Sequence, residues 1–104
     1  MTSFVQGRQL TLMLSGEIDH HGASILMRWC GEKIAEYLPK TCILDFRDVT
    51  FMDSSGIAVV IQTHRRMREL NGEVILRDIP AQSWKVLHAA GIERIAKVER
   101  SVPV

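Results

Sequence analysis

The fold is decided by one stretch, which reads TCILDFRDVTFM over residues 41–52, DSSG over 53–56 and IAVVIQTHRRMREL over 57–70. Its apolar, β-branched run from Cys42 to Phe46 predicts a buried strand. Beyond the turn, apolar side chains recur near the helical period, at Ile57, Val60, Ile61 and Met67. The stretch therefore predicts a strand, a polar turn and a helix that stops at Asn71-Gly72.

The polar turn holds the candidate chemistry. Asp53 or Ser54 suits the N-cap of the helix, because a short side-chain oxygen accepts a hydrogen bond from an otherwise unpaired amide of the first turn. Ser55 then falls at the helix start, and Gly56 beside it has no side chain that would shield the hydroxyl. We take Ser55 as the candidate functional residue, although a simple helix cap is the better explanation of this turn when it is considered alone.

The remaining elements follow from alternation and spacing on either side of this stretch. Apolar runs at Phe4-Val5 and Leu10–Leu14 predict a β-hairpin that turns at Gly7-Arg8. We further expect a polar loop at 16–22, a helix from Ala23 to Pro39, a strand at Glu73–Arg77, a helix opened by Pro80 and capped by Gly91, and a last strand at Ile95–Val98. Strands that alternate with helices after an opening hairpin predict an α/β fold with a mixed β-sheet and helices packed on it.

Length, charge and composition limit the class of protein. The length fits a single domain over residues 1–104. A formal charge of +1, from 13 Lys and Arg against 12 Asp and Glu, argues against nucleic acid and anionic membranes as partners. No apolar run approaches the roughly 20 residues that span a bilayer, and signal-peptide features are missing at the N-terminus. We expect a cytoplasmic monomer in which Cys30 and Cys42 are reduced, buried thiols.

Two groups of charged or titratable residues are further candidates, and each has a simpler explanation. Adjacent histidines at His20 and His21 point in different directions, which fits surface residues better than a metal site. Arg65, Arg66 and Arg68 fit a solvated helix face, and they become a recognition patch only with a complementary acidic partner. We expect no metal site and no cofactor.

A hydrolase is the enzyme class that the sequence comes nearest to. Ser55, Asp78 and His88 occur in the chain order of α/β-hydrolase triads. The nucleophile elbow of those enzymes needs a glycine two residues before the serine, where this chain has Asp53. No glycine-rich loop with a lysine supports nucleotide binding of the P-loop type either. We therefore expect a protein without catalysis of its own.

Two segments together resemble a known family. GEIDHH at residues 16–21 and FMDSSGI at 51–57 closely resemble the two signature loops of anti-sigma factor antagonists, members of the STAS domain family, and in particular the sporulation type. The resemblance continues through residues 71–73 and 90–92 and covers nearly the whole chain. It implies a STAS-type fold, and the joint presence of both loops is far more specific than either loop alone.

The resemblance also implies a function. In that family the serine directly before the glycine is phosphorylated by a partner that is both an anti-sigma factor and a serine kinase. Here that serine is Ser55, and the conserved aspartates of the two loops correspond to Asp19 and Asp53. The unmodified protein would bind the kinase and free the sigma factor for RNA polymerase. Phosphorylation would break this complex, a protein phosphatase would reset it, and ATP and magnesium would belong to the kinase.

We accordingly expect a partner surface built from both loops and one arginine of the following helix. It comprises Asp19, His20, His21, Asp53, Ser54, Ser55, Gly56 and Arg65. A phosphate adds about −1.5 to −2 charges at neutral pH. We expect this charge to block docking locally, through repulsion by neighbouring carboxylates, without rearranging the domain.

The sequence departs from the sporulation pattern at two places. The family commonly has a last helix where this chain stops at Val104, and Gly22 replaces a threonine, which we expect to loosen that loop. Two alternatives stay open. One is a phosphoacceptor resembling a response-regulator receiver, with Asp53 as the acyl-phosphate site, and the other is a STAS module of a stressosome-like scaffold or of a lipid-transport system.

Overall fold

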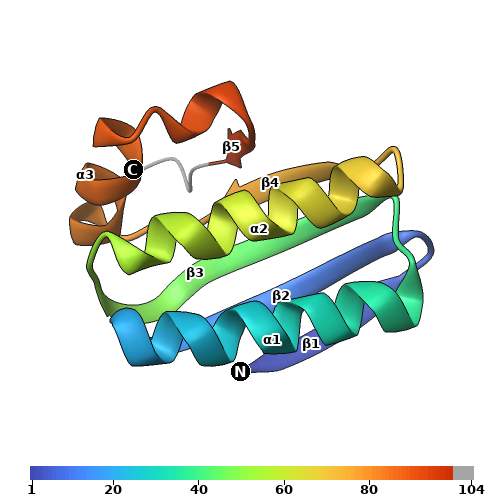
Figure 1. Ribbon diagram of the computed structural model, residues 1–104, viewed down its shortest axis with the longest axis horizontal. Helices are drawn as coiled ribbons and strands as arrows, with labels where there is room; N and C mark the ends of the chain where they lie inside the picture. The colour runs from blue at the N-terminus through green and yellow to red at the C-terminus, as the bar shows by residue number, and fades with distance from the viewer. Residues whose placement is uncertain (100–104) are drawn as a thin grey trace.

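The computed structural model describes residues 1–99, which form a five-stranded sheet with helices packed against it (Figure 1). In chain order the elements are β1 (Thr2–Gln6), β2 (Gln9–Ile18), α1 (His20–Tyr37), β3 (Thr41–Met52), α2 (Ser55–Glu69), β4 (Glu73–Arg77), α3 (Ala81–Ala89), the 3-10 helix η1 (Ile92–Arg94) and β5 (Lys97–Glu99). The sheet order is β1-β2-β3-β4-β5; β1 is antiparallel to β2, and the remaining pairs are parallel. This architecture confirms the predicted α/β fold with an opening hairpin.

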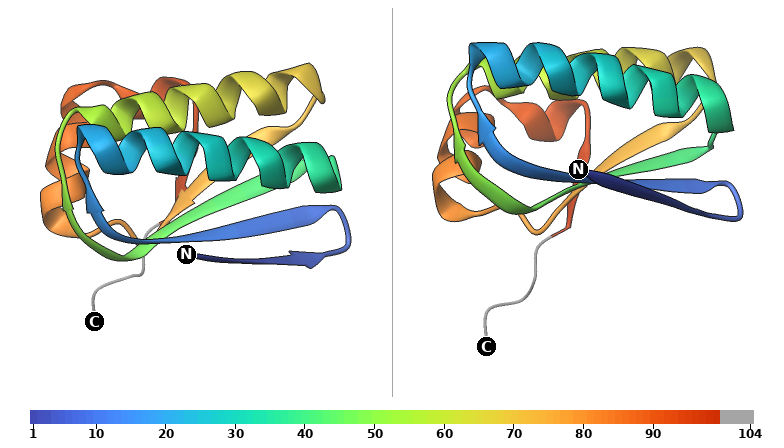
Figure 2. Two further views of the ribbon diagram at one scale, coloured as in Figure 1. Left: turned by 60° about the horizontal axis from the view of Figure 1, so that its bottom comes forward. Right: turned by 90° about the horizontal axis from the view of Figure 1, so that it is seen from below.

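The helices α1 and α2 lie side by side on one face of the sheet (Figure 2). Their placement follows from the strand order, because parallel strands that are neighbours in both sequence and space need crossovers of the same hand. Every such crossover puts its helix on the same face. The helix α3 lies beside the start of α2, at the end of the sheet toward which β3 runs (Figure 1).

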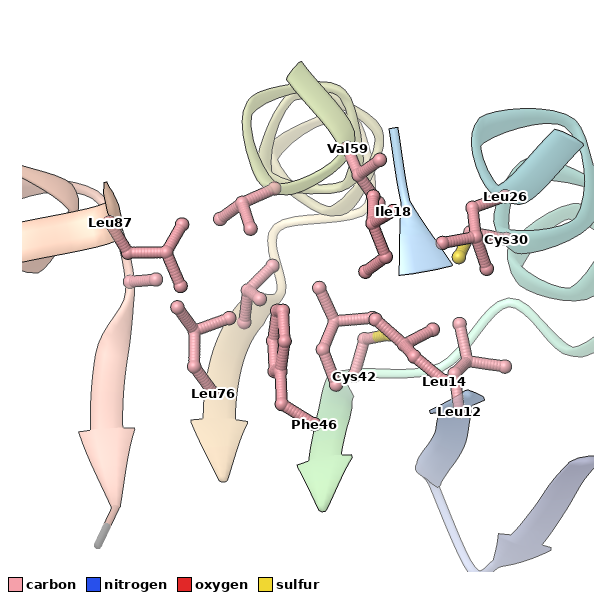
Figure 3. Packing of buried hydrophobic residues seen from close by; sticks show 14 of the residues in the cluster. Leu12, Leu14, Ile18, Leu26, Cys30, Cys42, Phe46, Val59, Leu76 and Leu87 are labelled. Carbon is pink, nitrogen blue, oxygen red and sulfur yellow. The ribbon is translucent and has the colours of Figure 1, made fainter. Parts of the chain in front are cut away.

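One apolar core joins the sheet to these helices (Figure 3). Alternate side chains of two strands point into this core: Leu10, Leu12 and Leu14 of β2, and Cys42, Leu44 and Phe46 of β3. Leu26 of α1, Val59 of α2 and Leu87 of α3 cover them from above. Full burial of such a side chain stabilises the fold by roughly 1.5–3 kcal/mol, so the period-two pattern of the strands determines which face receives the helices.

The strand β3 is longer than the predicted run from Cys42 to Phe46, since it continues to Met52. The prediction of a polar loop at residues 16–22 is wrong. Its first three residues extend β2, and His20 begins α1 before the predicted start at Ala23. The cause is long-range pairing: Gly16 adopts a positive φ of 80° between two register shifts, and β2 then stays paired with β3.

The C-terminal part differs from expectation in detail. Pro80 precedes α3 as its N-cap residue instead of occupying the first helical position. The last strand is Lys97–Glu99 and not the predicted Ile95–Val98. The reason is that Ile95 ends the 3-10 helix η1, so the strand begins later. The predicted loss of a family helix at the C-terminus falls on residues outside the described range 1–99. Among the helices of that range, none has the length and hydropathy needed to cross a bilayer.

Candidate functional site

The two signature loops lie together at the edge of the sheet where β2 and β3 end. Ile18 and Met52, the last residues of these parallel strands, are direct register partners. The Asp53 amide also donates to the Ile18 carbonyl at 3.2 Å. Because adjacent parallel strands end at the same edge, Asp19 and Asp53 follow neighbouring strand ends. Asp19 directly precedes α1, and Asp53 lies two residues before the start of α2.

Asp19 is the N-cap of α1. Its Oδ1 accepts a hydrogen bond from the Gly22 amide at 2.8 Å, which satisfies one of the free amides of the first turn. His20 and His21 are exposed residues of that same turn. The described residues contain no cluster of His, Cys, Asp and Glu that could hold a metal ion.

Gly22 does not loosen this segment. It lies inside α1, and a Cβ atom at this position would come within 2.7 Å of the Glu17 carbonyl oxygen. The absence of a side chain is what lets the first turn of α1 approach the end of β2. A threonine here would require the turn to move, so the expectation from sequence is corrected.

The second turn is held by Asp53, and not by a side-chain cap from Ser54. Asp53 Oδ1 accepts from the Ser55 amide at 2.8 Å, and its carbonyl accepts from Gly56 at 3.1 Å. Ser54 occupies the N-cap position of α2 with helical backbone angles and makes no side-chain cap bond. Both signature aspartates therefore have the same structural role, because each carboxylate accepts a hydrogen bond from a backbone amide at the start of a helix.

Ser55 is the first residue of α2 and is partly exposed. Its amide is held by Asp53, whereas its hydroxyl has no hydrogen-bond partner among the residues that the structure describes. The hydroxyl lies at a helix N-terminus, where the aligned peptide dipoles favour negative charge. The arrangement fixes the backbone of Ser55 through its amide and leaves its hydroxyl without a hydrogen-bond partner among the described residues.

Gly56 is required by packing. A Cβ atom at this position would lie 2.3 Å from Sδ of Met52, and the Met52 side chain is fully buried. Met52 therefore lies directly beneath the start of α2. Its backbone is held by a residue that the sequence did not reveal: Gln82 Oε1 accepts from the Met52 amide at 2.8 Å, and Gln82 Nε2 donates to the Met52 carbonyl at 2.7 Å. A glutamine on a short helix gives no signal in the sequence that would predict this contact.

The structure does not bring Arg65 to the two turns. Ten residues separate it from Ser55 along α2, which corresponds to about 15 Å of helix at 1.5 Å per residue. It instead lines an open groove between α2 and the segment after α3, together with Ile57, Ile61, His64 and Arg94.

Asp78 and His88, which follow Ser55 in the chain order of a hydrolase triad, interact with other residues. Asp78 Oδ2 pairs with Arg47 at 2.8 Å, and His88 Nδ1 lies 3.1 Å from Glu93. Among the described contacts, no hydrogen bond joins Ser55 to either residue. The triad expected from such enzymes does not form.

Two exposed apolar side chains lie close to the two turns along the chain. Phe51, on β3 just before the second turn, is 44% exposed, and Ile25, one turn into α1 from the first turn, is 49% exposed. The site thus combines a partly exposed serine, whose hydroxyl has no hydrogen-bond partner among the described residues, with two aspartate carboxylates that hold the turns.

Fold and site define a class: a small mixed α/β module that displays a serine at a helix start beside two aspartate-capped turns. The chain belongs to the STAS domain family, whose model matches residues 3–103. A curated relative is the anti-sigma F factor antagonist of Paenibacillus polymyxa, 27% identical over 89 residues that cover 86% of this chain and 76% of the relative.

Two solved structures share the fold. The anti-sigma factor antagonist SpoIIAA in its unphosphorylated form superposes with a TM-score of 0.81 at 24% identity, covering 97% of this chain and 87% of that one. The Bacillus cell fate determinant SpoIIAA in the phosphorylated form gives a TM-score of 0.73 at 24% identity, covering 97% and 90%.

Proposed function

We propose that this protein is an anti-sigma factor antagonist that is switched by phosphorylation of Ser55. The unphosphorylated form binds an anti-sigma factor that is also a serine kinase, and this binding releases the sigma factor. Phosphorylation ends the binding, and a protein phosphatase restores it. The observation that carries the proposal is the Ser55 hydroxyl at the start of α2, which has no hydrogen-bond partner among residues 1–99, in a chain of the STAS family whose two signature turns are each held by an aspartate.

The fold tolerates the modified state. A phosphate on Ser55 lies at the N-terminus of α2, where the helix dipole stabilises an anion by roughly 0.3–1 kcal/mol. The backbone contacts that hold the turn use the Asp53 carboxylate and backbone groups, none of which includes the Ser55 hydroxyl. Adding the phosphate therefore removes no hydrogen bond of the turn.

Binding to the partner responds differently. Docking removes water from the surface around Ser55, where the Asp19 and Asp53 carboxylates already lie. A phosphate there adds about −1.5 to −2 charges next to these acids, and the repulsion grows as water leaves. The proposed switch is therefore electrostatic and local.

The test is phosphorylation in vitro. The full chain is incubated with candidate anti-sigma kinases, ATP and magnesium, and the peptide that contains Ser54 and Ser55 is analysed by mass spectrometry. We expect one acid-stable phosphate on Ser55, loss of labelling in Ser55→Ala, and unchanged labelling in the neighbouring control Ser54→Ala. An acid-labile phosphate on Asp53 would support the receiver-type phosphoacceptor instead, and the absence of any phosphate with every kinase would contradict the proposal.

A further inference from the structure

The last residue of β3 lacks a strand partner on one side. β4 pairs with β3 only from Thr41 to Asp45, where the register ends at Arg77. β2 continues beside β3 up to the pair Ile18 and Met52. The Met52 side chain is fully buried, and a backbone amide or carbonyl left unpaired in such a place costs about 1–3 kcal/mol.

Gln82 supplies both missing hydrogen bonds. Its side-chain amide accepts from the Met52 amide at 2.8 Å and donates to the Met52 carbonyl at 2.7 Å. This two-point contact reproduces what a residue of a neighbouring strand would offer. It crosses from α3 to the end of β3, at the end of the sheet where α2 starts (Figure 1).

The position of Met52 affects the position of Ser55 through two contacts. The next residue, Asp53, holds the Ser55 amide at 2.8 Å through its carboxylate. The Met52 side chain in turn packs under Gly56, so closely that a Cβ atom there would be 2.3 Å from Sδ. Backbone and side chain of Met52 thus both bear on the first turn of α2.

We propose that Gln82 is a positioning residue for Ser55. Its two hydrogen bonds fix the position of the end of β3. They thereby determine the position of the Ser55 hydroxyl relative to the Asp19 turn. Gln82 touches neither the hydroxyl nor any group that reacts. The inference rests on the proposed function, because the consequence that matters is how well Ser55 fits the active site of the kinase.

The test compares Gln82→Leu with wild type. Leucine has a similar volume but removes both hydrogen bonds, and the position is exposed, so the core is not changed. Gln6→Leu on β1 is the matched control, an exposed glutamine on the edge strand. Amide hydrogen exchange is measured by NMR at Met52 and Ser55, and kcat and KM for phosphorylation are measured with the kinase.

We expect exchange at least about tenfold faster at both amides in Gln82→Leu. The Met52 amide then loses its acceptor, and the Ser55 amide, which Asp53 still holds, opens more often because the end of β3 is no longer fixed. We expect kcat/KM to fall by about tenfold to a hundredfold, because small misplacements of a reacting atom have effects of this size. Gln6→Leu should leave all these values unchanged.

The outcomes separate this inference from the proposed function. Unchanged exchange at Met52 in Gln82→Leu would overturn the inference whatever the kinase does. Faster exchange with an unchanged kcat/KM would overturn it as well. If wild type is not phosphorylated at all, the proposed function fails. The exchange data then decide the inference by themselves. Faster exchange at Ser55 in Gln82→Leu supports the positioning role, and unchanged exchange at Ser55 refutes it.

Discussion

Asp19 and Asp53 show how one residue type serves structure and function at once. Each carboxylate accepts from a backbone amide at 2.8 Å, and each contributes negative charge at the edge of the sheet where Ser55 lies. The hydrogen bond depends on the oxygen, whereas the repulsion of a phosphate depends on the charge. Substitution by asparagine keeps the first and removes the second, so the two roles are separable by experiment.

We predict that Asp19→Ala lowers the free energy of unfolding by about 0.5–2 kcal/mol, since the Gly22 amide loses its partner. Asp19→Asn should stay close to wild type, because the amide oxygen still accepts this bond. Urea titrations monitored by circular dichroism measure both values. An equal loss in the two variants would show that charge, and not the cap, stabilises α1.

Gly56 and Gly31 are both buried glycines of helices, but their surroundings differ. A Cβ at Gly56 would meet Met52 Sδ in the core, whereas at Gly31 it would meet Nε of Arg66 at 2.9 Å. The Arg66 side chain belongs to an exposed residue that has room to move. The same added methyl group therefore has different consequences at the two positions.

We predict that Gly56→Ala destabilises the protein by about 1–3 kcal/mol through overpacking against Met52. Gly31→Ala should cost less, because the arginine shifts and alanine gains helix propensity of about 1 kcal/mol over glycine. Thermal unfolding of both variants gives the comparison. A smaller loss for Gly56→Ala than for Gly31→Ala would contradict the packing described for the second turn.

The helices α1 and α2 begin at the same edge because the strands that lead into them are parallel and paired to their ends. This arrangement brings together two turns that lie more than thirty residues apart in the chain. The start of α2 rests on hydrogen bonds that exclude the Ser55 hydroxyl. Modification at this hydroxyl is therefore expected to leave the element intact.

We predict that Ser55→Asp leaves α2 helical from its first turn and shifts the melting temperature by no more than a few degrees, because surface changes are usually within about 0.5 kcal/mol. Kinase binding should nevertheless be lost. Backbone chemical shifts of residues 55–69 report the helix, and titration calorimetry reports the binding. A rebuilt α2 would show that the switch acts by rearrangement and not by local repulsion.

One apolar core joins the helices and the sheet that residues 1–99 form, and both cysteines are inside it (Figure 3). Burial raises the pKa of the Cys30 thiol from an ordinary 9.0 to about 12, and a hydrogen bond with Thr63 opposes part of this shift. Burial also raises the pKa of Cys42, with a smaller contribution from the nearby Cys30. Both thiols are therefore protonated and shielded in the folded state.

We predict that the two thiols react with Ellman's reagent in the native protein only as fast as the molecule unfolds. Stability should also fall as pH rises above about 9, because the unfolded chain then releases thiol protons that the folded chain retains. Unfolding free energies at pH 8 and pH 10 measure this loss, and Cys42→Ala should make it smaller. Rapid labelling at pH 8 would mean that the core opens locally.

The sequence by itself determined the local features: the alternating and helical periods, the opening hairpin, the turn at residues 53–56 and the serine at its helix start. Such features depend on neighbours in the chain, which a period or a cap motif records. Tertiary structure alone decided that β3 runs on to Met52, that the Asp19 turn lies beside the Asp53 turn, and that Gln82 closes the free edge of β3. The reason is physical: these features are backbone hydrogen bonds between segments far apart in the chain, and a polar stretch such as Arg47-Asp48 carries no pattern that reveals which strand or side chain will pair with it.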